Sequence, residues 1–141
     1  MVTGVVGPAR PKVISGRDGE AIMLRGEDTT LRKVTGITEE QERRICDFLQ
    51  GAVYSWCKNR KGEWFSMRDL MGGDNYYWEG TPLIVLYRKY ENTADDPVKQ
   101  AGQDSGWLLK KVISEDNRVF NTTRSDEQIR KYLWVPEEGE E

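Results

Sequence analysis

The chain has 141 residues, of which 37% are hydrophobic and 32% are charged, and its formal net charge is −3. This length suits one domain, and the composition is too apolar for a disordered chain and too polar for a membrane protein. The longest apolar run, Leu83 to Tyr87, is too short to span a bilayer, and no basic stretch followed by an apolar block marks a signal peptide. We therefore expect a cytoplasmic protein.

Two cysteines and the lack of histidine limit the chemistry that the chain can perform. Cys46 and Cys57 fall within one expected helix, where eleven residues correspond to roughly 16 Å, too far apart for a disulfide. Histidine is the commonest general base and metal ligand, so its absence counts against catalysis and against a metal site. We expect two buried thiols, no cofactor, no metal and no enzymatic activity.

The acidic charge is concentrated at the end of the chain. Glu137, Glu138, Glu140 and Glu141 supply four of the acids, and without the last five residues the net charge changes from −3 to +1. Residues 97–135 contain seven basic and five acidic residues. This mild basic bias permits nucleic-acid binding but does not establish it. We expect the tail, residues 137–141, to be disordered.

Residues 1–36 hold six of the fourteen glycines and few large apolar side chains. Two alternatives are open for this part of the chain. Lys12 to Ser15 and Glu20 to Arg25 can form a hairpin around a Gly-Arg-Asp-Gly turn, or the whole segment is a flexible arm.

The strongest helix prediction covers Thr38 to about Asn59. Thr38 and Gln41 have the spacing of a capping box, and three glutamates place negative charge in the first turn. Apolar residues then recur at helical spacing and give one stripe: Ile45, Phe48, Leu49, Ala52, Val53 and Trp56.

Residues 63–66 suit a very short strand, and Ser66 with Asp69 predicts a second capping box that opens a short helix, Met67 to Met71. Thr81 and Pro82 then predict the start of a helix that runs to about Glu91. The intervening aromatic cluster invites the idea of stacking on single-stranded nucleic acid, but core packing explains it more simply because few basic residues interleave with it. Its members are Trp64, Phe65, Tyr76, Tyr77 and Trp78.

Asp96 and Pro97 repeat the helix-start signal, and an apolar stripe continues to about Glu115, although Gly102 and Gly106 weaken the first half. Two strands follow, at residues 118–122 and 128–135, and imperfect alternation in the second indicates a bulge.

This order of elements over about residues 37–135 resembles a winged helix-turn-helix domain with one extra helix. The expected fold class is therefore α+β, mainly helical with a small antiparallel sheet. We expect an arm at residues 1–36, the winged-helix-like domain at 37–136 and the acidic tail.

The resemblance implies that the helix from Pro97 to Glu115 is a recognition helix and that the hairpin tip, Thr122 to Ser125, is a wing. Gln can bond adenine edges, and Lys and Arg can reach guanine or phosphate. The alternative is that these polar side chains are only the solvated side of the helix. The candidate nucleic-acid contacts are Lys99, Gln100, Gln103, Lys110, Lys111, Arg124 and Arg130, and Ser114 shares the expected outer face.

Trp107 is unusual because helical spacing places this large aromatic residue on the polar face. Either the hairpin or the arm covers it, or it contacts a partner. The resemblance implies a protein that binds duplex DNA, as a regulator or a factor of a mobile element. The alternative is a non-enzymatic protein-interaction or dimerisation module on the same scaffold, with a protein partner or a second copy as its ligand.

Overall fold

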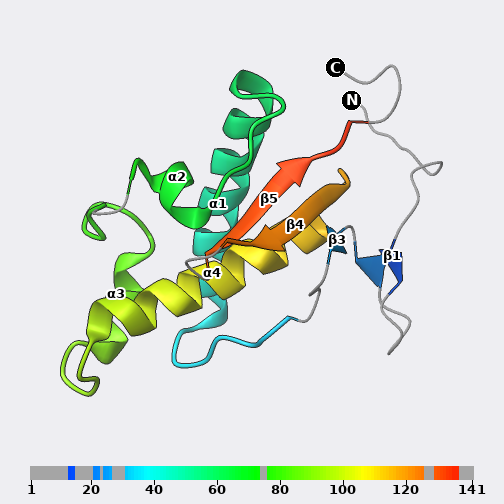
Figure 1. Ribbon diagram of the computed structural model, residues 1–141. Helices are drawn as coiled ribbons and strands as arrows, with labels where there is room; N and C mark the ends of the chain where they lie inside the picture. The colour runs from blue at the N-terminus through cyan, green and yellow to red at the C-terminus, as the bar shows by residue number, and fades with distance from the viewer. Residues whose placement is uncertain are drawn as a thin grey trace.

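The computed structural model describes residues 13–14, 21–22, 24–26, 31–73, 76–125 and 129–136. Within these ranges, four helices precede an antiparallel hairpin, so the fold is α+β and mainly helical, as the sequence predicted (Figure 1). The helices are α1 (Glu39–Asn59), α2 (Met67–Met71), α3 (Ile84–Tyr90) and α4 (Pro97–Glu115). The strands are β1 (Val13–Ile14), β2 (Ala21–Ile22), β3 (Leu24–Gly26), β4 (Phe120–Arg124) and β5 (Arg130–Trp134).

The core lies where α1, α4 and one face of the sheet meet. Figure 1 shows α4 crossing α1, with α3 beside the N-terminal part of α4 and the hairpin running back from its C-terminal end. Each large apolar side chain buried there stabilises the fold by roughly 1.5–3 kcal/mol. The fully buried members include Ile45, Leu49 and Val53 from α1, Leu108, Leu109 and Ile113 from α4, and Phe65, Phe120 and Tyr132 from the sheet region.

The two predicted capping boxes are confirmed. The Thr38 hydroxyl accepts a hydrogen bond from the Gln41 amide at 3.0 Å, and the Gln41 side chain accepts one from the Thr38 amide at 2.9 Å. Ser66 and Asp69 exchange the corresponding bonds at the start of α2, which ends at Gly72 in a left-handed conformation that favours glycine. Local hydrogen bonding therefore determines where α1 and α2 begin.

One helix differs in extent from the sequence prediction. The helix expected from Thr81 and Pro82 begins only at Ile84, because the Thr81 hydroxyl accepts a hydrogen bond from the Leu83 amide at 3.1 Å and holds the chain in a turn. By contrast, α4 runs from Pro97 to Glu115 as predicted, with the Asp96 side chain accepting from the Lys99 amide at 3.2 Å. The two glycines in its first half do not delay its start.

The hairpin is more regular than predicted, its first strand lies two residues later, and its second strand is shorter. Its register runs through five consecutive pairs, from Phe120 opposite Trp134 to Arg124 opposite Arg130, so the predicted bulge is wrong. Strand β4 begins at Phe120 because the Asp116 carboxylate accepts a hydrogen bond from the Arg118 amide at 2.8 Å and forms a turn there.

The strand expected at residues 63–66 is reduced to one antiparallel bridge between Phe65 and Tyr132. The Phe65 amide donates to the Tyr132 carbonyl at 2.9 Å, and the Tyr132 amide donates to the Phe65 carbonyl at 2.8 Å. This bridge ties the segment between α1 and α2 to the edge of β5.

Part of the N-terminal segment pairs with the sheet and packs into the core. Strands β1 and β2 pair antiparallel, which is the hairpin alternative of the sequence analysis. Strand β3 pairs parallel with β4 and makes a three-stranded sheet in the order β3-β4-β5. Val34 is 5% exposed and joins the core. The acidic tail, residues 137–141, lies outside the described residues.

None of the helices that the structure describes combines the length and the apolar character that a membrane span requires.

Candidate nucleic-acid interface

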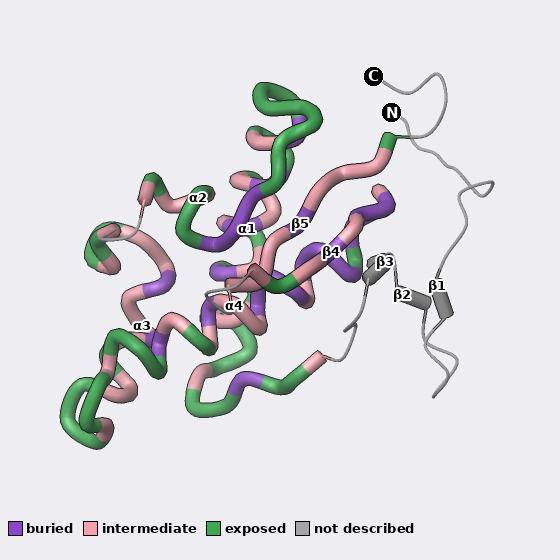
Figure 2. Tube along the Cα trace, in the orientation of Figure 1, coloured by how far each residue is buried: buried purple, intermediate pink, exposed green. Residues whose placement is uncertain are grey.

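The first two turns of α4 present the exposed face that a recognition helix needs. Lys99, Gln100 and Gln103 are exposed, and their spacing of three and four residues places them on one side of the helix. Val98 beside them is 54% exposed. In Figure 2, exposed residues gather at this end of α4 and in the turns on either side of α3. Three of the predicted contacts therefore lie together and face solvent.

The second half of α4 is covered, and two residues expected on its outer face are buried. Lys110 is 2% exposed and Ser114 is 5% exposed. The Ser114 hydroxyl donates to the Lys111 carbonyl at 2.8 Å, back into its own helix. The prediction that Lys110 contacts nucleic acid is wrong for this structure, because its ammonium group has no path to a phosphate.

Trp107 lies beneath the arm, one of the two outcomes that the sequence left open. The Arg32 guanidinium lies 5.1 Å from the centroid of the Trp107 ring, and the Lys110 ammonium lies 5.5 Å from it. Cations at this distance are attracted to the face of an indole. The residues before α1 therefore pack against this helix face and leave Trp107 only partly exposed.

Lys111 is engaged by an acid from another helix. Its Nζ lies 2.7 Å from Glu42 Oε2 in α1, with 40% of the lysine side chain and 23% of the glutamate side chain exposed. The hydrogen bond to Glu42 raises the pKa of Lys111. This ion pair links α4 to α1. Because Glu42 already balances its charge, Lys111 offers little attraction to an external phosphate.

The hairpin end brings two of the predicted arginines together. The register sets Arg124 directly opposite Arg130, and strand alternation puts both side chains on one face of the hairpin. Arg124 is exposed, and the half-buried Arg130 donates to the Thr122 hydroxyl at 3.3 Å. The predicted tip is wrong in its position, because Thr122 to Arg124 lie within β4, and the two guanidinium groups belong to the last pair of the strand ladder.

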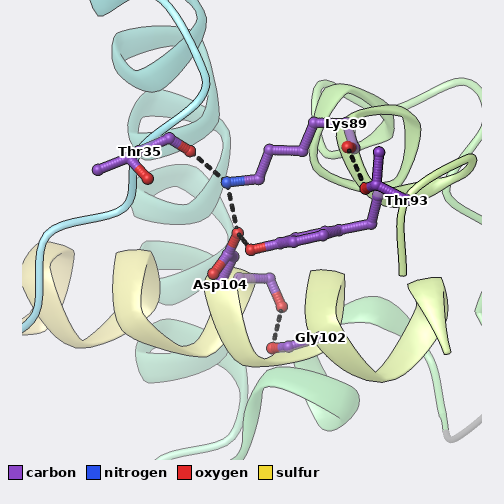
Figure 3. Close-up of polar contacts among 7 residues, drawn as sticks. Thr35, Lys89, Thr93, Gly102 and Asp104 are labelled. Atoms are coloured by element: carbon purple, nitrogen blue, oxygen red, sulfur yellow. Dashed lines mark hydrogen bonds and ion pairs between the residues drawn. The ribbon is translucent and has the colours of Figure 1, made fainter. Parts of the chain in front are cut away.

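A polar interlock fixes the exposed half of α4 to its neighbours (Figure 3). Lys89 Nζ from α3 lies 2.7 Å from Asp104 Oδ2 in α4 and also donates to the Thr35 carbonyl. The Tyr90 hydroxyl donates to the same Asp104 oxygen at 2.9 Å. Burial raises the pKa of Tyr90, and its hydrogen bond to Asp104 raises that pKa further.

Sequence reasoning missed this interlock because its members come from three separate segments and no spacing links them. Its donors and acceptors satisfy one another, and the Lys89 and Asp104 side chains are only 16% and 14% exposed. The arrangement is therefore suited to holding residues 31–36, α3 and α4 in place rather than to chemistry on a substrate.

Among the residues that the structure describes, no group of three or more acidic or cysteine side chains is arranged to hold a metal ion. Comparison with protein-family models, curated proteins and solved structures gives no significant match to this chain.

Proposed function

We propose that this protein binds double-stranded DNA through the first two turns of α4 and the arginine pair of the hairpin. The observation that carries the proposal is the exposed row of Lys99, Gln100 and Gln103 on the helix that leads into the hairpin. A major groove admits one helix, and recognition helices contact base edges with their N-terminal residues. The covered second half of α4 then holds the first two turns of the helix in position.

The arrangement of elements supports the same proposal. Helix α4 is followed at once by a two-stranded hairpin, and that hairpin carries Arg124 opposite Arg130. Arginine suits the recognition of phosphate because its planar fork can donate two hydrogen bonds. The interface is smaller than the one predicted from the sequence, because Lys110 is buried and Lys111 is bound to Glu42.

Two acids at the start of α4 limit how a duplex can approach. Asp95 and Asp96 are both exposed, and Asp96 caps the helix. Asp95 has no such capping role among the described contacts, and its charge repels phosphates near the helix N-terminus. Asp95→Asn is therefore expected to tighten duplex binding at low salt, whereas a helix that does not meet DNA would be insensitive to this change.

The test is fluorescence anisotropy with a labelled duplex in 50 mM salt. Lys99→Glu is expected to weaken binding by about tenfold or more and to reduce the slope of log affinity against log salt by about one. Lys58→Glu is the matched control, since Lys58 is also exposed but lies at the far end of α1 from this part of α4 (Figure 1). Equal losses in both variants, or no duplex binding at low salt, would contradict the proposal.

A second candidate, a protein-interaction or dimerisation module, is favoured by the exposed aromatic residues. Tyr77 is 85% exposed and Tyr54 is 55% exposed, and tyrosine is common among the residues that dominate protein interfaces. Light scattering tests the homodimer form of this idea, because one chain has a mass of 16.3 kDa. A mass near twice this value for the wild type, together with a lower mass for Tyr77→Ala, would favour the interaction module.

A further inference from the structure

Trp64 is an exposed aromatic residue whose backbone is held on both sides. It is 40% exposed, whereas the next residue, Phe65, is fully buried and pairs with Tyr132. On the other side, the Glu63 carbonyl accepts a hydrogen bond from the Trp56 indole at 3.1 Å. The Glu63 amide donates to the Arg60 carbonyl at 3.2 Å, which closes the turn after α1. The backbone on either side of Trp64 is therefore held in place.

Cations border Trp64 along the chain. Lys58, Arg60 and Lys61 are exposed at the end of α1 and in the following turn. Arg60 lies 5.4 Å from the centroid of the Trp56 ring and 3.5 Å from the Glu63 carboxylate, while 59% of its side chain remains exposed. Residues 58–63 thus contain three basic side chains and one acidic side chain.

The sheet extends the same surface. The bridge pairs Phe65 with Tyr132, so the antiparallel register carried on by one residue places Leu133 opposite Trp64. Lys131 lies on the same face as Leu133, two residues along β5. Both are partly exposed, in contrast to the buried Tyr132 between them. This register places an apolar and a basic side chain of β5 on the same face as Trp64.

We propose that Trp64 is the stacking platform of a site for single-stranded nucleic acid. An unpaired base stacks on the indole, and the adjoining phosphates meet the cations of the α1 turn and Lys131. Proteins that bind single strands combine an aromatic platform with a positive surface that follows the backbone. Bases in a duplex already stack on each other and leave no face for the indole, so the site selects unpaired strands.

This site is separate from the surface proposed for duplex DNA and does not rest on that proposal. The turn after α1 and the N-terminal end of α4 lie at opposite ends of the molecule in Figure 1. The sequence analysis favoured core packing for the whole aromatic cluster. That prediction is confirmed for Phe65, but Trp64 and Tyr77 are exposed.

The test uses the full chain and a labelled oligothymidylate of twenty nucleotides, which forms no hairpin. Trp64→Ala is expected to weaken its binding by about five- to a hundredfold, in line with the cost of losing one base–aromatic stack. Tyr77→Ala, which removes a more exposed aromatic residue elsewhere, is expected to change the affinity less than twofold. Lys58→Glu is expected to weaken this binding, whereas Lys99→Glu is not.

Trp64→Phe is a second variant that keeps the test valid if Trp64→Ala does not fold. Phenylalanine retains a stacking face, so its affinity is expected to stay within about threefold of the wild type. The quenching of tryptophan fluorescence by oligothymidylate is expected to fall sharply in this variant. Unchanged quenching in Trp64→Phe, equal binding by Trp64→Ala and Tyr77→Ala, or no binding at 50 mM salt would overturn the proposal. Duplex binding measured in parallel separates this failure from a failure of the proposed function.

Discussion

Asp104→Asn is the change that most sharply tests how the interlock stabilises the fold. The substitution keeps the shape of the side chain and an oxygen that can accept from the Tyr90 hydroxyl, but it removes the charge that faces Lys89. The Lys89 ammonium, with 16% of its side chain exposed, then loses its carboxylate at 2.7 Å. The free energy of unfolding should fall because that ammonium has lost its counter-charge.

The magnitude follows from the burial of the pair. Breaking a fully buried ion pair costs about 3–5 kcal/mol, whereas an exposed pair contributes about 0–1 kcal/mol. With side chains about 15% exposed, the Lys89–Asp104 pair lies between these limits. We expect Asp104→Asn to lower the free energy of unfolding by about 2 kcal/mol, since solvent screens part of the effect.

The chain supplies a matched control at the same distance. Lys111 Nζ and Glu42 Oε2 are also 2.7 Å apart, but 40% and 23% of these side chains are exposed. Glu42→Gln is expected to cost about 1 kcal/mol or less, including the loss of negative charge in the first turn of α1. Urea unfolding at pH 7, followed by circular dichroism, gives both values from the midpoint and the slope.

The comparison between the two variants tests whether burial determines how much each ion pair stabilises the fold. A larger loss in Asp104→Asn than in Glu42→Gln supports burial as the factor that makes the interlock strong. Equal losses, or a larger one in Glu42→Gln, would refute the reasoning, because the two pairs have the same N–O distance and Asp104→Asn keeps an acceptor for the Tyr90 hydroxyl.

Three further predictions concern single side chains. Burial raises the pKa of Tyr90, so the stability that this shift supplies is present below pH 10 and is lost as pH rises through the folded-state pKa. Urea midpoints measured against pH should show this decline, and Tyr90→Phe should flatten it. Burial also raises the pKa of Cys46 to about 11, so iodoacetamide at pH 8 should label it slowly by mass spectrometry until urea unfolds the chain. Thr38→Ala should cost about 1 kcal/mol in urea unfolding by removing the α1 cap, whereas Thr38→Ser should cost little.

Helix boundaries could be predicted because the signals are local. The bond between Thr38 and Gln41 spans three residues, and the same holds for Ser66 with Asp69 and for Asp96 with Lys99. Each cap is satisfied by its own segment, whatever the rest of the chain does. The fold class followed from these boundaries and from the hairpin after α4.

The burial of Lys110 could not be predicted, because it depends on contacts distant in sequence. Helical spacing places Lys110 beside Trp107 and away from the apolar stripe, which describes a helix packed on one side only. In the structure, residues before α1 also pack on α4, as Arg32 over Trp107 shows, and β3 pairs with β4. Parallel pairing between segments so far apart leaves no periodic signal in either one.

The candidate site was predicted in part for the same reason. Lys99, Gln100 and Gln103 precede the stretch that the arm covers, so helical spacing alone placed them correctly in solvent. Trp64 was assigned to the core with its neighbours because composition does not show which aromatic residues point outward. Only the bridge between Phe65 and Tyr132 fixes which of the two neighbours, Trp64 or Phe65, faces the core.

The most direct test of the central claim, duplex recognition by the exposed half of α4, is a nuclear magnetic resonance titration of ¹⁵N-labelled protein with a short duplex at low salt. The amides of Lys99, Gln100, Gln103 and Arg124 should show the largest shifts, while those around the buried Lys110 should move little. Shifts that spare residues 98–104 and the hairpin end, or a spectrum that the duplex leaves unchanged, would contradict the claim.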